Sequence, residues 1–332
     1  MVDQVVVTDE LVKVYGPVRA LNDVSIRINR GEVFAVLGPN GAGKTTLMRI
    51  LTTQIKPTSG RALVMGYDVV NEDYKVRRVI GYVPQEFSVW TDLTGYEDLL
   101  IYAKIYGIPR REVNGKIKEV LEFMDLVDAS RRLVNTYSGG MVRRLEIATA
   151  LLTEPEVLFL DEPTVGLDPA AREIVWDRLT MLNKERGITI VFNSHYMDEV
   201  ELYAGRVAML NKGKVVIQGT VDELKRTVGG EVIELTVNSV EDAVGLTHGL
   251  DAGVKEVNTD GGRGVIRVIV DNADVALPIL IKALQSHGID VRRVSMFKPT
   301  LDDVFLRYVG GRITEEGRLS ELRAIRAAVK RG

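Results

Sequence analysis

The spacing of apolar side chains predicts strands and helices that alternate along most of the chain. Roughly the first 35 residues alternate apolar and polar positions as strands do, with a turn at Tyr15-Gly16-Pro17. The run from Val33 to Leu37 is continuously apolar, which is typical of a strand buried on both faces. From Leu93 to Thr153 the pattern is mostly helical, and Thr94 to Glu97 predicts a capping box at a helix start.

Strands and helices alternate again after this helical stretch. Val157 to Leu160 and Ile188 to Phe192 have the length and composition of buried strands. Between them, Asp168 and Pro169 predict the N-cap and first turn of a helix that ends near Gly187. This order predicts an α/β domain over residues 1–228, with a helical subdomain at about 86–153.

The pattern changes near residue 228, where Gly229-Gly230 predicts a linker. The elements expected after it are, in order, a strand, a helix, two strands, a helix and a strand, at residues 231–237, about 240–249, about 254–258, about 264–270, 273–286 and 290–297. The order β-α-β-β-α-β is that of a ferredoxin-like fold. We therefore predict a small α+β accessory domain over residues 229–310, followed by a charged helical tail over 311–332.

The composition narrows the range of functions. Hydrophobic residues make up 45% and charged residues 27%, as in a folded globular protein. No stretch approaches the roughly 18 to 20 apolar residues of a membrane-spanning helix, and no secretory signal is visible, so we expect a cytoplasmic chain. The net charge of −3 gives no reason to expect nucleic acid as a partner. The absence of cysteine excludes disulfides and thiolate metal sites.

A phosphate-binding motif lies between the buried strand at 33–37 and the helix expected after it. Residues 38–45 match G-x-x-x-x-G-K-[ST], in which backbone N–H groups and the helix N-terminus surround phosphate oxygens. Lys44 is expected to reach the β- and γ-phosphates of ATP, and Thr45 to place its hydroxyl on Mg²⁺. The predicted ATP-binding residues of this segment are Gly38, Pro39, Asn40, Gly41, Ala42, Gly43, Lys44, Thr45 and Thr46.

Two carboxylates follow the apolar run at 157–160. Asp161 and Glu162 stand at the carboxyl end of a buried strand, where α/β sheets bind their ligands. Asp161 suits the Mg²⁺ site, through water, and Glu162 suits a general base that polarises the attacking water. Such a pair is also a common strand end, but the phosphate motif upstream favours the catalytic interpretation.

Further motifs, in the same order along the chain, resemble those of the ABC transporter family. Tyr137-Ser138-Gly139-Gly140-Met141 resembles the signature L-S-G-G-Q, and a helix is expected to begin after it, around Val142. The resemblance implies a P-loop NTPase core of the ABC ATPase type. It also implies roles for single residues: adenine stacking for Tyr15, catalysis and Mg²⁺ binding for Gln85, and a switch histidine in His195.

The same resemblance places Asp168 in the D-loop. Taken singly, each of these residues has a simpler interpretation. Tyr15 suits a half-buried strand position, Gln85 an ordinary loop, Asp168 an N-cap and His195 a structural histidine. It is their joint order that favours the functional roles. The predicted catalytic set is therefore Glu162, His195 and Gln85, and the predicted metal set is Thr45, Gln85 and Asp161.

The signature departs from the consensus at both ends. Tyr137 replaces the leucine and Met141 the glutamine, and Arg143-Arg144 follows. This combination is similar to the daunorubicin-resistance type of multidrug ATPase subunit, as is the segment from Lys298 to Phe305. The resemblance covers roughly residues 5 to 310.

The resemblance implies a mechanism in which two nucleotide-binding subunits close head to tail. Each ATP would lie between one P-loop and Ser138, Gly139, Gly140 and Asp168 of the other subunit. One set of motifs is present, so a second copy or a paralogue is required. The chain would hydrolyse ATP to energise a separate membrane permease that exports a drug or lipid-like compound, and would sit peripherally on the inner face of the membrane.

Two other functions are compatible with a cassette of this kind. One is a soluble ABC ATPase acting on DNA or ribosomes, although the long coiled coil, zinc cysteines or second cassette usual in such proteins are not present. The other is a nucleotide-gated regulator without hydrolysis, against which Glu162 and His195 argue. Near the end of the chain, Leu301, Val304 and Phe305 form one apolar helical face, which packs on its own domain or serves assembly.

Overall fold

The computed structural model describes residues 3–250, 252–260 and 264–309. The chain forms two compact units, one up to Val221 and one from Asp222 onward, and each is described here by itself. The predicted tail at 311–332 lies outside the described residues.

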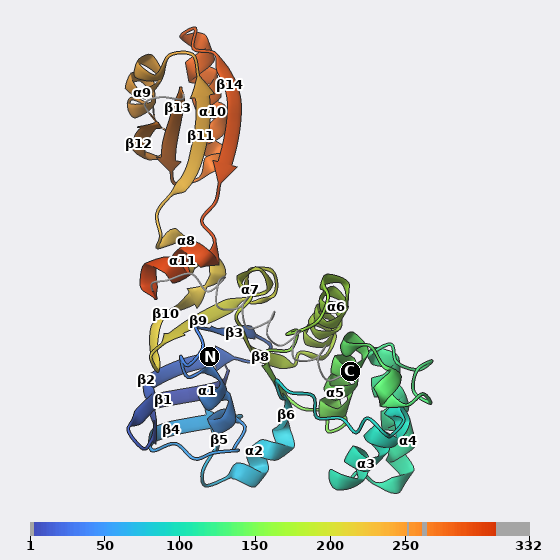
Figure 1. The fold of residues 1–332 in the computed structure, drawn as a ribbon. Helices are drawn as coiled ribbons and strands as arrows, with labels where there is room; N and C mark the ends of the chain where they lie inside the picture. The colour runs from blue at the N-terminus through green and yellow to red at the C-terminus, as the bar shows by residue number, and fades with distance from the viewer. Residues whose placement is uncertain (1–2, 251, 261–263, 310–332) are drawn as a thin grey trace. The chain divides into compact units, whose positions relative to one another are not determined.

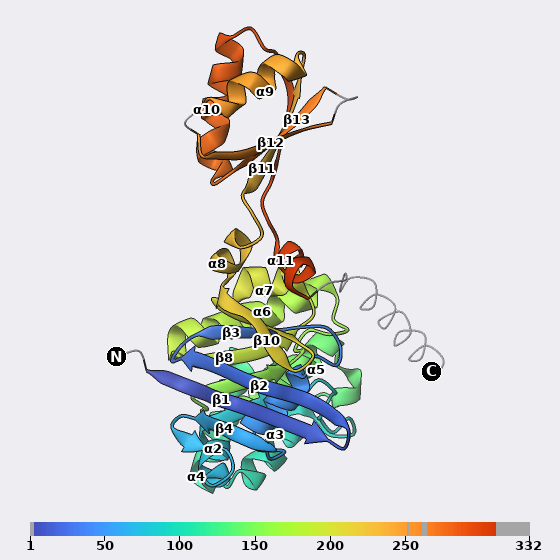
Figure 2. The same cartoon turned by 90° about the vertical axis from the view of Figure 1, so that its left-hand side faces the viewer.

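An antiparallel sheet opens the first unit. Its order is β2-β1-β4-β5, with bounds β1 Gln4–Tyr15, β2 Val18–Asn29, β4 Ser59–Val64 and β5 Tyr67–Asp68. Figure 2 shows the long strands β1 and β2 side by side, joined by the predicted turn, in which Tyr15 pairs with Val18. The alternating pattern buries one face of the sheet, with Val6, Ile26 and Val64 among its core residues.

A six-stranded sheet forms the centre of the first unit. Its order is β10-β9-β3-β8-β7-β6, with bounds β3 Val33–Leu37, β6 Ile80–Val83, β7 Val157–Asp161, β8 Thr189–Ser194, β9 Arg206–Asn211 and β10 Lys214–Thr220. The pairs from β9 to β6 are parallel and β10 is antiparallel. Strands β3, β7 and β8 are apolar on both faces because helices cover a parallel sheet from both sides.

The helices of the first unit fall into two groups. Those that alternate with the central strands are α1 Lys44–Leu51, α2 Asp73–Val79, α6 Pro169–Arg186 and α7 Met197–Tyr203. Those between β6 and β7 are α3 Gly95–Ile105, α4 Arg110–Phe123, the short helix Val134–Thr136 and α5 Gly139–Leu151. Figure 1 shows α3, α4 and α5 packed together beside β6, which confirms the expected helical insertion in an α/β core.

The helix ends follow the sequence signals. The Thr94 side chain accepts from the N–H of Glu97, whose carboxylate bonds back to Thr94, so the predicted capping box is present. Asp168 caps α6 and Gly187 ends it in a left-handed conformation with a φ of 66°. Helix α5 begins at Gly139 rather than near Val142, because the Ser138 hydroxyl caps it by accepting from the Met141 N–H (3.3 Å).

The second unit contains a four-stranded antiparallel sheet on which helices α9 and α10 pack, with the further helices α8 and α11. Its elements are α8 Val221–Arg226, β11 Glu231–Val237, α9 Val240–His248, β12 Val254–Asp260, β13 Val265–Val270, α10 Ala273–Ser286, β14 Val291–Phe297 and α11 Leu301–Tyr308. The strand order β12-β13-β11-β14 confirms the ferredoxin-like arrangement. Its core is formed by alternate strand positions such as Ile233, Leu235 and Ile266.

Helix α11 carries the apolar face predicted near the end of the chain. Leu301, Val304 and Phe305 are buried, but they are not part of the core between the sheet and helices α9 and α10. The Arg307 guanidinium donates to the carbonyl oxygen of Thr227, just after α8. Whether this face also serves assembly stays a prediction. Within the described part of the chain, no helix has the length and apolar character to span a membrane.

A buried acid lies in the first turn of α3. The side chain of Asp98 is fully buried; its Oδ1 accepts from the Trp90 N–H (3.0 Å), and its Oδ2 forms no hydrogen bond. Burial raises the pKa of Asp98 to about 6, even though the hydrogen bond from the Trp90 N–H acts against this shift. The folded state therefore holds a proton on Asp98 at pH values where the unfolded chain has lost it.

We expect this acid to make stability depend on pH. Its neutral form stabilises the fold fully below about pH 4, and this contribution is lost as the pH rises toward the folded-state pKa. Relative to wild type, Asp98→Asn should gain about 2 to 3 kcal/mol of unfolding free energy between pH 4 and pH 7.5. Urea unfolding, followed by the fluorescence of Trp90 and Trp176, measures the difference, and a difference that is constant with pH would contradict the assignment.

Candidate functional site

The phosphate-binding loop joins the carboxyl end of β3 to the first turn of α1. At Gly43, φ is 107°, and a Cβ atom would lie 2.5 Å from the Ala20 carbonyl oxygen, so only glycine fits there. The Lys44 ammonium donates to the carbonyl oxygens of Gly38 (2.7 Å) and Pro39 (3.3 Å) and lies over its own loop. Burial lowers the pKa of Lys44, while Glu162 and Asp161 act against that shift. The lysine is thus a buried cation beside two carboxylates.

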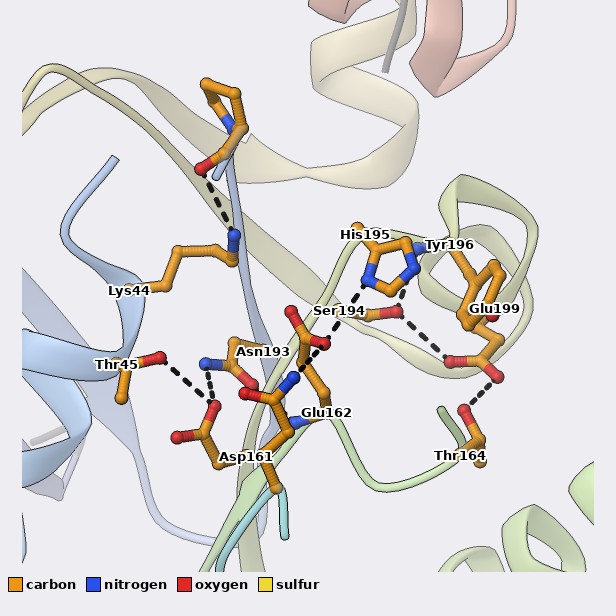
Figure 3. Close-up of polar contacts among 12 residues, drawn as sticks. Lys44, Thr45, Asp161, Glu162, Thr164, Asn193, Ser194, His195, Tyr196 and Glu199 are labelled. Carbon is orange, nitrogen blue, oxygen red and sulfur yellow. Dashed lines mark hydrogen bonds and ion pairs between the residues drawn. The ribbon is translucent and has the colours of Figure 1, made fainter. Parts of the chain in front are cut away.

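Thr45 and Asp161 meet beneath this loop. The Thr45 Oγ1 and the Asp161 Oδ1 lie 3.5 Å apart, and the Asn193 amide donates to the same Asp161 oxygen (2.6 Å), as Figure 3 shows. Burial raises the pKa of Asp161 above its ordinary value, and the hydrogen bond from Asn193 offsets only part of this shift. A hydroxyl and a carboxylate at this spacing suit a hard divalent cation, which prefers oxygen ligands.

The second carboxylate, Glu162, faces two polar side chains. Its Oε2 accepts from the Gln85 amide (3.1 Å). The same oxygen lies 3.4 Å from the His195 Nδ1 (Figure 3). Burial opposes the ionised form of Glu162, but the hydrogen bond and charge of His195 outweigh it, so the pKa of Glu162 is lowered. Glu162 is therefore ionised at neutral pH, as a general base must be.

The central sheet explains why these three residues meet. Gln85 follows β6, Glu162 follows β7 and His195 follows β8, and these are adjacent parallel strands. Their carboxyl ends converge at one edge, where α/β sheets bind ligands. The backbone of Glu162 has a φ of 49°, and its N–H donates to the Asn193 side chain (2.6 Å). This left-handed conformation turns its side chain away from that of Asp161, its neighbour in the sequence (Figure 3).

The residues expected to contact a partner's nucleotide form a separate group. Ser138 caps α5, and Asp168 caps α6 by accepting from the Ala171 N–H (3.0 Å). The two helix starts approach closely, since a Cβ atom on Gly140 would lie 2.8 Å from that of Ala171. Within the described chain, no hydrogen bond joins this group to the phosphate-binding loop. The simpler interpretation of Asp168 as an N-cap is thus correct, and a second role remains compatible with it.

Tyr15 lies outside both groups. Its side chain is exposed at the end of β1, and the Lys13 ammonium lies 5.0 Å from its ring centroid. Nothing in the described contacts ties it to the phosphate-binding loop. Adenine stacking by Tyr15 stays a prediction.

Two residues of the site were not anticipated from the sequence. Asn193 bonds both Asp161 and the backbone of Glu162 and so fixes their relative positions. Glu199, on α7, accepts from the Thr164 hydroxyl and from the Ser194 hydroxyl (3.2 Å). It therefore joins the turn after Glu162 to the residue before His195. Its partners Thr164 and Ser194 lie in other segments, so no local pattern in the sequence indicates this role.

Comparison with known proteins identifies the family. Residues 21–165 match the family described as ABC transporter, and residues 219–309 match the C-terminal domain of ATP-binding proteins like DrrA1-3. The chain is 40% identical to the daunorubicin resistance ATP-binding protein DrrA3 of Streptomyces coeruleorubidus, over 93% of this chain and 97% of that protein. This chain belongs to the ATP-binding proteins of ABC transporters, in the drug-resistance group.

Other relatives of this ABC ATP-binding protein agree with the assignment. The daunorubicin/doxorubicin resistance protein DrrA of Streptomyces peucetius is 37% identical over 93% of this chain and 94% of its own length. Among solved structures, cbiO1 of Clostridium perfringens matches with a TM-score of 0.62 and 32% identity, over 68% of this chain and 94% of its own. A dimeric ATP-binding cassette bound to ADP and Pi matches with a TM-score of 0.59 and 28% identity, over 65% of this chain and 98% of its own. The predicted family and fold class are confirmed, and both support ATPase activity.

Glu199 offers a test of how the site is held together. Replacing it by glutamine removes the carboxylate that accepts from Thr164 and Ser194 and lies 3.3 Å from the Arg172 guanidinium. Hydrogen bonds to a charged group contribute about 1.5 to 3 kcal/mol each. We expect Glu199→Gln to lower kcat for ATP hydrolysis about tenfold and to change the KM for ATP less than about twofold. Asp198→Asn, on the exposed side of the same helix, is the control. Equal turnover in the two variants would remove Glu199 from the site.

Proposed function

We propose that this chain binds Mg-ATP and hydrolyses it to ADP and phosphate as the energising subunit of a drug exporter. The observation that carries the proposal is the position of the Glu162 carboxylate, which lies between Gln85 and His195 and adjoins the buried Asp161. An ionised carboxylate oriented from two sides, beside a complete phosphate-binding loop, is suited to activating a water molecule against the terminal phosphate.

Nucleotide binding falls to the loop between β3 and α1. The backbone N–H groups of residues 38–46 and the start of α1 would surround the β- and γ-phosphates. Lys44 would exchange the Gly38 and Pro39 carbonyl oxygens for phosphate oxygens, which recovers a charge-assisted contact for a cation that is already buried. Tyr15 would stack on the adenine.

Thr45, Asp161 and Gln85 are the residues that would hold Mg²⁺. The first two already place oxygens 3.5 Å apart, and the Gln85 side chain lies on the neighbouring Glu162. When bound, Mg²⁺ would neutralise charge on the phosphates. Asn193 fixes the orientation of Asp161 and leaves its other oxygen free of that bond.

In the chemical step, a water oxygen attacks the γ-phosphorus and the bond from that phosphorus to the β–γ bridging oxygen breaks. Glu162 accepts the proton that the water loses, and the ADP oxygen leaves with the bonding electrons. His195, held 3.4 Å from Glu162, would orient the terminal phosphate and the carboxylate together. Gln85 would orient the water from the opposite side.

Two copies of the chain would be needed for a complete site. Ser138, Gly139, Gly140 and Asp168 form one group at adjacent helix starts, away from the chain's own phosphate loop. Helix N-termini with exposed N–H groups bind phosphate well, and the related cassette that was solved with ADP and Pi is a dimer. We propose a homodimer in which each of these groups closes on the nucleotide of the other copy. Met141 offers no polar side-chain contact there, so Ser138 and backbone N–H groups would carry the recognition.

The remaining parts of the chain would serve coupling and assembly. Relatives of this chain are named as drug-resistance ATP-binding proteins. We propose that it works with a separate membrane permease in export of a drug or lipid-like compound, at the inner face of the membrane. We assign residues 1–228 to the nucleotide-binding domain, with about 86–153 as its helical part, and 229–310 to an accessory domain outside the phosphate chemistry.

Glu162→Gln tests the chemistry directly. The substitution keeps the size of the side chain and its contact with Gln85 but removes the base, so ATP should bind as in wild type while kcat falls on the order of 10² to 10⁴-fold. Nucleotide titration and phosphate release measure the two quantities. Lys44→Ala is the matched control, because it should weaken binding itself. Turnover near the wild-type rate with glutamine at this position would exclude Glu162 as the base.

A further inference from the structure

The segment that carries Gln85 is bound by the helix that begins at Ser138. The side chain of Arg143, on α5, is 1% exposed. Its guanidinium donates to the carbonyl oxygens of Pro84 (2.7 Å) and Gln85 (2.9 Å) and lies 5.1 Å from the ring centroid of Phe87. Arg143 thus fixes the peptide groups on both sides of Gln85.

One turn further along α5, Glu146 holds the other end of the same segment. Its Oε1 accepts from the backbone N–H (2.5 Å) and the hydroxyl (3.0 Å) of Ser88. Its Oε2 lies 3.0 Å from the Arg143 guanidinium, and the pair is almost completely buried. Residues 84–88 are therefore bound at both ends by two charged side chains of a single helix.

A buried ion pair of this kind needs an explanation other than stability. Removing two charges from water costs several kcal/mol, and apolar side chains of the same size often stabilise as well or better. The pair instead orients the segment, because its hydrogen bonds fix the carbonyl oxygens of Pro84 and Gln85 and the N–H of Ser88. Apolar packing would not specify this.

We infer that Arg143, supported by Glu146, is a positioning residue for Gln85. Because α5 is one helix from Gly139 to Leu151, the Gln85 segment and the Ser138 end of α5 move as one body. When Ser138 docks on the nucleotide of a second copy, a movement of α5 would act on the contact that Gln85 already makes with Glu162 of its own copy (3.1 Å). This inference rests on the proposed role of Gln85. It links nucleotide binding at the site of the second copy to the position of Gln85 in the site of the first.

Arg144 is a matched control for this inference. It is the next residue of the same helix and also donates to backbone carbonyl oxygens, those of Met124 (2.8 Å) and Asp125 (3.1 Å). These belong to the turn after α4 and not to the Gln85 segment. Loss of either arginine removes hydrogen bonds to two backbone carbonyl oxygens, but only Arg143 also pairs with a buried carboxylate, that of Glu146. Faster exchange confined to residues 85–88 therefore reports the loop that Arg143 holds.

The experiment compares Arg143→Met with Arg144→Met in the full chain, by hydrogen–deuterium exchange and steady-state hydrolysis. With Arg143→Met, the amides of residues 85–88 should exchange about tenfold faster and kcat should fall about tenfold, as the loss of bonds to a charged group implies. With Arg144→Met, both quantities should stay within about twofold of wild type. Unchanged exchange at 85–88 in the first variant, or equal changes in both, would overturn the inference.

Two further variants keep the test decisive. If Arg143→Met does not fold, Arg143→Lys keeps the charge but replaces the two donor nitrogens that bond Pro84 and Gln85 by a single one. It should raise exchange at 85–88 in the same direction, and wild-type exchange there would overturn the inference. Gln85→Ala separates the two proposals. Full hydrolysis by that variant would refute the role of Gln85, while the exchange measurements on Arg143 would still decide whether Arg143 holds the segment.

Discussion

The pairing of β7 with β8 is the constraint on which the rest of the site depends. It sets Asp161 opposite Asn193 in the sheet, and the Asn193 side chain then bonds both Asp161 and the backbone of Glu162. Two neighbouring carboxylates are thereby turned in different directions. One lies beside Thr45, where we propose that a cation binds, and the other lies between Gln85 and His195, where we propose that a water molecule is activated. Like charges so close would otherwise disfavour ionisation of both.

Around this pair, buried polar groups hold the surrounding segments in place. Glu199 joins the turn after Glu162 to the segment of His195, and Arg143 with Glu146 holds the segment of Gln85. Buried polar groups are costly unless their bonds are made, so each network specifies one arrangement. The two side chains that face Glu162, those of Gln85 and His195, thus depend on residues in α5 and α7. This would connect the proposed chemistry to the helices that move when two copies meet.

The sequence predicted the parts of this architecture that local patterns determine. The strand and helix on either side of the loop at 38–43, the capping box at Thr94 and the order of elements after Glu231 depend on neighbours in the chain, and all are found as expected. The roles of Asn193 and Glu199 depend on contacts between strands and loops far apart in sequence. In the sequence, Arg143 and Arg144 contributed only to the family resemblance. Consecutive helical residues point in different directions, and the sequence alone does not show which segment each side chain contacts.

The central claim is that a complete hydrolytic site needs two copies of this chain. It is tested most directly by measuring the specific ATPase activity of the purified chain over about a hundredfold range of protein concentration, with sedimentation in Mg-ATP alongside. Below the dimer dissociation constant, the account predicts that activity per chain rises in proportion to concentration and follows the fraction of dimer. Constant activity per chain, from a species that sediments as a monomer throughout, would contradict it.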